Sequence, residues 1–228
     1  GRLSFLPAKN VVADANWEAD DYVVRVRGKI REAVVFGTNL ELTREISTVL
    51  GEKSIRIHDR IENLSTAPSP LMFVYHCNPG FPVLDAGTRF VIRSEKSTEW
   101  QEDREVTAEQ YTVARAPKDE PNAVVYVHRP VADSDGNVRV GLINDSLKLG
   151  IYWKFPVSEI PLISQWQNFH KGSYVTGVEP GNVSMLGRAW NRKHGYLKHI
   201  QPGEVRHFHL EIGVLDGADE IAAFEKKV

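Results

Sequence analysis

Apolar and polar residues alternate along most of this chain, and this period of two predicts β-strands rather than helices. Ser54–Asn63 is the clearest case, because its isoleucines and Asp59 share one face while His58 and the charged residues share the other. Tyr22–Ile30 and Val205–Leu215 alternate in the same way. Leu71–Cys77 is apolar on both faces, which predicts a central strand buried on both sides.

The stretch Leu162–Asn182 reads LISQWQNFHKGSYVTGVEPGN and predicts two short strands joined by a glycine-bearing turn. Ala218–Lys226 suits a short terminal helix, and Ser94–Lys118 is a charged, irregular excursion. Further strands are expected at Leu40–Leu50, Arg89–Arg93, Val124–Arg129, Val138–Asn144 and Lys148–Phe155. Roughly a dozen short strands separated by turn residues indicate an all-β sandwich or barrel. A chain of 228 residues fits a single domain over residues 1–228.

Composition narrows the classes of partner. The net charge is −2 with both signs interspersed, which argues against nucleic acid binding. No apolar run approaches the roughly 20 residues of a membrane-spanning helix. Cys77 is the single cysteine, so nothing indicates an oxidising compartment and a cytoplasmic location is expected. The chain opens on Gly1 without an initiator methionine, so its native start is expected to lie upstream.

Two side chains are candidates for proton transfer. His76 precedes the turn at Asn78–Pro82, at the end of an apolar strand where scaffolds present reactive groups, although a satisfied core histidine is the alternative. Glu179 ends the second strand of Leu162–Asn182, where burial beside Trp166 would raise its pKa toward neutrality. Its alternative is a carboxylate tied to a nearby backbone turn or arginine. Together the two residues would supply one acid and one base, with no nucleophile, metal or cofactor required.

The surrounding residue types suit a sugar, because indole faces stack on sugar rings and amides bond hydroxyls. Trp166, Gln165, Asn78 and Asn182 offer such groups. His207 and His209 have a spacing that could ligate zinc, but no further ligand with motif spacing follows, and an exposed sheet face is preferred. A basic cluster could contact an anionic substrate group or be a solvated loop; it comprises Arg188, Arg192, Lys193 and Lys198.

Several segments resemble one family. They are Val74–Pro82, Gln165–Trp166, Tyr174–Asn182, Gly28–Leu42 and Ile57–Leu64, and they are similar to the aldose 1-epimerase-like bacterial proteins of the galactose mutarotase superfamily, in a branch apart from the well-studied mutarotases. The resemblance implies a large antiparallel β-sandwich with a sugar site on the concave face of one sheet. It implies that His76 is the general acid on the ring oxygen and Glu179 the general base on the anomeric hydroxyl.

The resemblance also implies substrate contacts from Arg2, Asn78, Gln165, Trp166 and Asn182. The aspartate that orients the substrate in well-studied mutarotases has no match by motif, although Asp59 and Asp145 are available. In relatives, several strands precede an element like Gly1–Arg2, so the sandwich is expected to lack its N-terminal strands here. Its exposed sheet edge would then pair with the missing segment or with a second copy in a homo-oligomer.

The sequence therefore predicts a cofactor-independent sugar epimerase that interconverts the anomers of an aldose. Two alternatives stay open on the same scaffold. One is a carbohydrate-binding protein without turnover. The other is a lyase or isomerase that acts on a modified or acidic sugar, with the basic cluster binding the anionic group.

Overall fold

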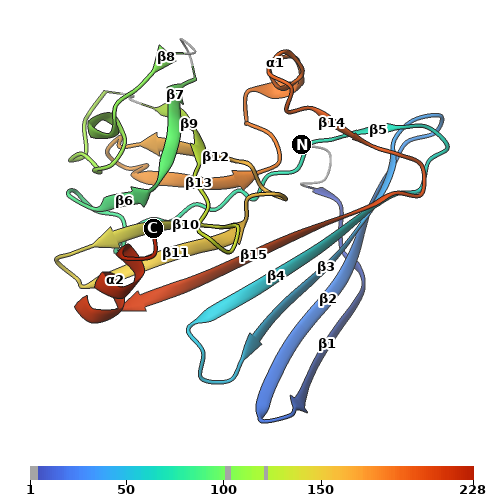
Figure 1. Ribbon diagram of the computed structural model, residues 1–228, viewed down its shortest axis with the longest axis horizontal. Coiled ribbons are helices and arrows are strands. Elements are labelled where there is room, and N and C mark those ends of the chain that lie inside the picture. The colour runs from blue at the N-terminus through green and yellow to red at the C-terminus, as the bar shows by residue number, and fades with distance from the viewer. Residues whose placement is uncertain (1–4, 101–103, 121–122) are drawn as a thin grey trace. The chain divides into compact units, whose positions relative to one another are not determined.

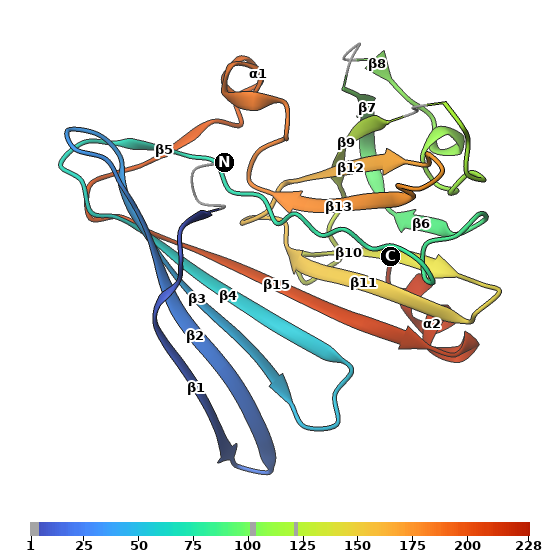
Figure 2. The same cartoon turned by 180° about the vertical axis from the view of Figure 1, so that it is seen from behind.

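The computed structural model describes residues 5–100, 104–120 and 123–228 (Figures 1 and 2). The chain forms two compact units. The first unit comprises Gly1–Leu71 and Leu197–Glu211, and the second comprises Met72–Tyr196 and Ile212–Val228. That residues 1–228 make a single domain stays a prediction. No helix in these described ranges is long and apolar enough to cross a membrane.

The first unit is an antiparallel sheet of long strands. β1 (Lys9–Glu18), β2 (Asp21–Ala33), β3 (Asn39–Val49) and β4 (Ser54–Asn63) lie in chain order, as Figure 1 shows, and the early part of β15 (Val205–Asp216) follows β4. β5 (Ser69–Leu71) pairs with β14 (Lys198–Ile200). Asp59 is fully buried on the apolar face of β4, where Arg44 donates hydrogen bonds of 2.8 and 2.7 Å to its two carboxylate oxygens.

The second unit contains two antiparallel sheets. The later part of β15 continues into β11 (Leu149–Pro156), β10 (Asn137–Asn144) and β6 (Arg89–Ile92). The second sheet has the order β13 (Val175–Gly181), β12 (Leu162–Asn168), β9 (Val124–Pro130), β7 (Ser94–Glu99) and β8 (Arg104–Glu105). The unit also holds α1 (Gly187–Lys193), α2 (Ala218–Glu225) and a 3-10 turn at Ala108–Gln110. The predicted all-β, antiparallel sandwich class is confirmed.

The core of the second unit explains the terminal helix. Ile221 and Phe224 of α2 are buried against Ile143 of β10 and Leu215 of β15. Burying apolar side chains of this size is worth about 1.5–3 kcal/mol each, which holds a helix too short to be stable alone. Trp153 of β11 is also buried.

Two expectations about elements were wrong, and one helix was not predicted. Leu71–Cys77 is not a buried central strand: β5 ends at Leu71, and beyond it Val74 and Cys77 form only isolated bridges. Burial there is one-sided, because Phe73 and Tyr75 are buried while His76 is exposed. The excursion Ser94–Lys118 contains two strands, and α1 was not foreseen because its seven residues are too few for a helical period to emerge.

Candidate active site

The candidate site lies where the segment after β5 runs alongside β13, as Figure 2 shows. The backbone N–H of Tyr75 donates to the Pro180 carbonyl at 2.9 Å, and the N–H of Val178 donates to the Cys77 carbonyl at 2.8 Å. Cys77 therefore lies opposite Val178. Side chains alternate along both partners, so His76 falls on the same face as Glu179.

His76 and Glu179 are in direct contact. The imidazole Nε2 lies 3.1 Å from the carboxylate Oε1, with the His76 side chain 50% exposed and that of Glu179 only 2% exposed. On its other side, His76 Nδ1 lies 2.5 Å from the amide oxygen of Asn78. An amide oxygen only accepts hydrogen bonds, so Nδ1 carries a hydrogen and Nε2 is the nitrogen that faces Glu179.

Burial sets the acidity of Glu179. Loss of hydration raises the pKa of its carboxyl above the ordinary value of 4.5, and the charge of protonated His76 opposes that rise. A carboxylate with a raised pKa accepts a proton more readily near neutral pH than an exposed one. The pair thus combines a buried base with a partly exposed imidazole that solvent or a ligand can reach.

Two glycines make room for this arrangement. A Cβ at Gly177 would overlap Oε1 of Glu179, so the absence of a side chain there lets the carboxylate fold back over β13. A Cβ at Gly181 would lie 2.8 Å from Cγ2 of Val74 and 3.0 Å from the Phe73 carbonyl oxygen. Gly181 therefore allows the segment that carries His76 to approach β13. Neither role was evident from the sequence.

Two other predicted residues, Trp166 and Asn78, lie beside the pair, and Asn182 holds the segment that carries His76. Trp166 is opposite Gly177 on β12, so its half-buried indole is on the same face as Glu179. Asn182 accepts a hydrogen bond of 2.8 Å from the Phe73 N–H through its side-chain oxygen, and it thereby fastens the His76 segment to the end of β13. Asn78 orients His76 through the contact described above. Arg2 lies outside the described residues.

Gln165 lies on the opposite face of β12, because Ser164 is the residue opposite Glu179. Its side chain is 2% exposed, its carbonyl oxygen accepts from Nε2 of His128 at 3.1 Å, and its amide donates to the Tyr111 carbonyl at 3.0 Å. The structure therefore does not present its amide beside the His76–Glu179 pair. Its hydrogen bonds instead join β12 to His128 of β9 and to the backbone at Tyr111.

His128 is the buried member of that network and was not singled out from the sequence. Its Nδ1 lies 2.8 Å from the hydroxyl of Ser97, and complete burial lowers its pKa to about 4, so the ring is neutral at physiological pH. With Nε2–H donating to Gln165, Nδ1 accepts from the Ser97 hydroxyl. Its position inside the apolar strand VVYVHRP was the signal available for a buried, hydrogen-bonded histidine.

The remaining candidates are engaged elsewhere. Asp145 accepts hydrogen bonds of 2.7 and 2.9 Å from Arg89, and Asp59 is held by Arg44, so each available aspartate faces an arginine. His58 stacks against His209 with ring centroids 4.3 Å apart. Within the described part of the chain, no group of three or more histidine, cysteine, aspartate or glutamate side chains could hold a metal ion.

Comparison with known proteins shows the family and the fold. Residues 1–214 match the model of a family described as "Domain of unknown function (DUF4432)". No protein with a curated description matches the chain. Among solved structures, one from Klebsiella pneumoniae described as a candidate aldose 1-epimerase is 26% identical, with a TM-score of 0.92 over 100% of this chain. This chain spans 59% of the length of that protein.

Two more distant structures share the fold. A galactose mutarotase-like protein from Clostridium acetobutylicum is 15% identical, with a TM-score of 0.62 over 90% of this chain and 66% of its own. A candidate aldose 1-epimerase from Escherichia coli is 14% identical, with a TM-score of 0.59 over 89% of this chain and 68% of its own. The predicted resemblance to the galactose mutarotase superfamily is confirmed at the level of fold.

Proposed function

We propose, from the premise that this chain belongs to the DUF4432 family and shares its fold with candidate aldose 1-epimerases, that it interconverts the anomers of an aldose. The observation that carries the proposal is the contact of 3.1 Å between His76 Nε2 and Glu179 Oε1. This contact supports the proposal because an imidazole and a carboxylate on one sheet face are groups that can act as an acid and a base.

The reaction needs only these two groups. Glu179 takes the proton of the anomeric hydroxyl while His76 Nε2 gives a proton to the ring oxygen, and the bond between that oxygen and the anomeric carbon breaks. The open aldehyde then rotates about its first carbon–carbon bond. In reclosure the protons return along the same routes, so the opposite anomer forms and the pair regains its starting state.

The geometry suits a sugar at its anomeric centre. The anomeric hydroxyl and the ring oxygen are bonded to the same carbon, so a sugar whose anomeric carbon lies over the pair presents one oxygen to each side chain. Asn78 keeps a hydrogen on Nδ1 and thereby directs Nε2 toward the substrate. Trp166 offers an apolar face for the ring beside Glu179.

The test is NMR measurement of anomer exchange on freshly dissolved aldoses. Wild-type protein is compared with Glu179→Gln and with Glu109→Gln, a matched removal of an exposed carboxylate on the 3-10 turn. Wild type and Glu109→Gln should accelerate exchange, and Glu179→Gln should lose about 10²–10⁴-fold of that acceleration. Equal rates in all three would sink the proposal. Sugar-induced chemical shifts without acceleration would instead indicate a carbohydrate-binding protein.

A further inference from the structure

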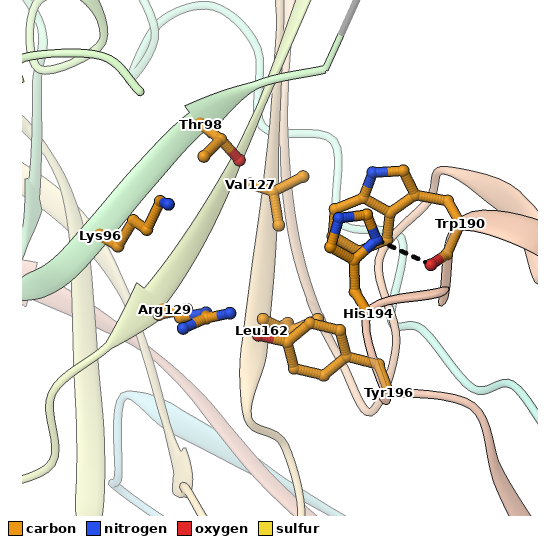
Figure 3. A pocket seen from close by; sticks show the side chains of 8 residues that line it. All are labelled: Lys96, Thr98, Val127, Arg129, Leu162, Trp190, His194 and Tyr196. Carbon is orange, nitrogen blue, oxygen red and sulfur yellow. Dashed lines mark hydrogen bonds between the residues drawn. The ribbon is translucent and has the colours of Figure 1, made fainter. Parts of the chain in front are cut away.

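A small pocket lies on the five-stranded sheet of the second unit (Figure 3). Its volume is about 130 Å³. Strands β7, β9 and β12 form one wall, and α1 with the residues that follow it forms the other. Its lining residues are Lys96, Thr98, Val127, Arg129, Leu162, Trp190, His194 and Tyr196.

Strand register puts this pocket on the same face as Glu179. Glu179 lies opposite Ser164, Ser164 opposite Val127, and Val127 opposite Thr98, so one row of side chains crosses four strands. Lys96 and Arg129 are opposite each other, two residues along from Thr98 and Val127 on the same face. Since neighbouring strands are about 4.8 Å apart, Val127 is roughly 10 Å from the Glu179 position across the sheet.

The two cations on the sheet are poorly neutralised. Like charges directly opposite each other on neighbouring strands destabilise a sheet. Their ion pairs with described residues are at the limit of such contacts: Lys96 Nζ lies 3.8 Å from Glu105 and Arg129 Nη1 lies 4.0 Å from Glu95. Both glutamates are more than 60% exposed. An anion between Lys96 and Arg129 would relieve this repulsion.

The opposite wall supplies aromatic surfaces. His194 stacks on Trp190 with ring centroids 3.9 Å apart, as Figure 3 shows, and the Arg129 guanidinium lies 5.7 Å from the centroid of the Tyr196 ring.

We propose that this pocket binds an anionic group, a phosphate or a carboxylate, carried by the aldose at the end remote from its anomeric carbon. The inference rests on the proposed function and narrows its substrate to acidic or phosphorylated aldoses. Pockets for whole ligands of drug size measure about 300–1,000 Å³, so this smaller one suits an appended group rather than the sugar itself. The charges come from Lys96 and Arg129, and none of the basic cluster of Arg188, Arg192, Lys193 and Lys198 lines the pocket.

The experiment compares anomer exchange of glucose, glucose 6-phosphate and glucuronate. The protein variants are wild type, the double variant Lys96→Gln/Arg129→Gln, and the control Arg93→Gln, whose exposed arginine does not line the pocket. Wild type and the control should show a KM for one of the anionic sugars lower than that for glucose by on the order of tenfold to a hundredfold. The double variant should lose this preference while its kcat on glucose is unchanged, and circular dichroism should confirm that it folds.

A second measurement separates the two proposals. Titration with inorganic phosphate at low ionic strength, followed by NMR, should shift the Trp190 indole resonance in wild type and not in the double variant. Phosphate binding without exchange of any sugar would refute the proposed reaction and leave the pocket assignment standing. Exchange with equal KM for neutral and anionic sugars would overturn the pocket assignment and leave the reaction standing.

Discussion

The imidazole Nε2 of His76 contacts Oε1 of Glu179 at 3.1 Å, although His76 belongs to an irregular segment and Glu179 to a regular strand. A hydrogen bond between these two atoms needs a hydrogen on one of them. The proposed chemistry requires the pair to hold that hydrogen as an exchangeable proton.

The pH dependence of anomer exchange should reveal the raised pKa of Glu179. Burial raises the pKa of Glu179, so kcat/KM is expected to fall on the acid side at a pH above 4.5, the ordinary value for a glutamate. The reason is that a protonated carboxyl cannot accept the proton of the anomeric hydroxyl. Exchange rates measured from pH 4 to pH 9 would locate the pH at which kcat/KM falls. A fall only at or below pH 4.5 would contradict a desolvated base.

Glu179 should also reduce the stability of the folded protein. Because its pKa is raised on folding, the folded state binds the proton more tightly than the unfolded state does. Proton binding by Glu179 therefore stabilises the folded state at a pH below the pKa that Glu179 has in the unfolded chain. This stabilisation is lost as the pH rises through the raised pKa of Glu179 in the folded protein. Glu179→Gln, which cannot ionise, should therefore have a higher Tm than wild type at pH 8, with the difference shrinking toward pH 4. A variant less stable at every pH would show that the contact with His76 outweighs desolvation.

Gly177 should be intolerant of a side chain for a reason that concerns Glu179. In Gly177→Ala the added methyl group would displace the carboxylate, so exchange activity should fall at least tenfold. Overpacking would cost about 1–3 kcal/mol of unfolding free energy. Gly80→Ala is the matched control, because a Cβ there meets nothing within 4 Å and its φ is not positive. Denaturant titration and NMR exchange would be measured on both, and equal behaviour of the two variants would refute the steric account.

The stacked histidines of the first unit should make the protein sensitive to acid. Burial, followed by the charges of His209 and His207, lowers the pKa of His58 below 6.5, with Glu45 and Asp59 opposing. The unfolded state therefore binds a proton more readily, and stability present above pH 6.5 should decline as pH falls below it. His58→Gln should flatten the decline in Tm between pH 7 and pH 5, whereas the exposed His199→Gln should not. Parallel profiles of Tm against pH for wild type and His58→Gln would refute the assignment of this acid sensitivity to His58.

Local patterns predict where the strands lie better than they predict which strands are neighbours. Ser54–Asn63 was predicted with the bounds that β4 has, because its alternation is regular and ends in a loop with two prolines. Leu71–Cys77 failed because an apolar run does not reveal whether both of its faces are covered. The choice of His76 and Glu179 came from residue type and motif, but their contact depends on how β13 aligns with a segment distant in sequence.

Register also decides which of two adjacent polar residues faces the site. Ser164 and Gln165 are neighbours, and only the pairing of Ser164 with Glu179 shows that Gln165 points away. Lys96 and Arg129 were overlooked for the same reason, since nothing in their own segments shows that they become opposite residues. Interactions between strands are set by tertiary packing, which the period of a single strand does not encode.

The row of side chains from Glu179 to Thr98 has an evolutionary consequence. The reacting pair belongs to β13 and the segment beside it, whereas Lys96 and Arg129 belong to β7 and β9. Different stretches of the gene therefore encode the chemistry and the proposed recognition of the anionic group. Codon changes on β7 and β9 could exchange one sugar for another in a descendant while the proton-transfer pair is inherited intact.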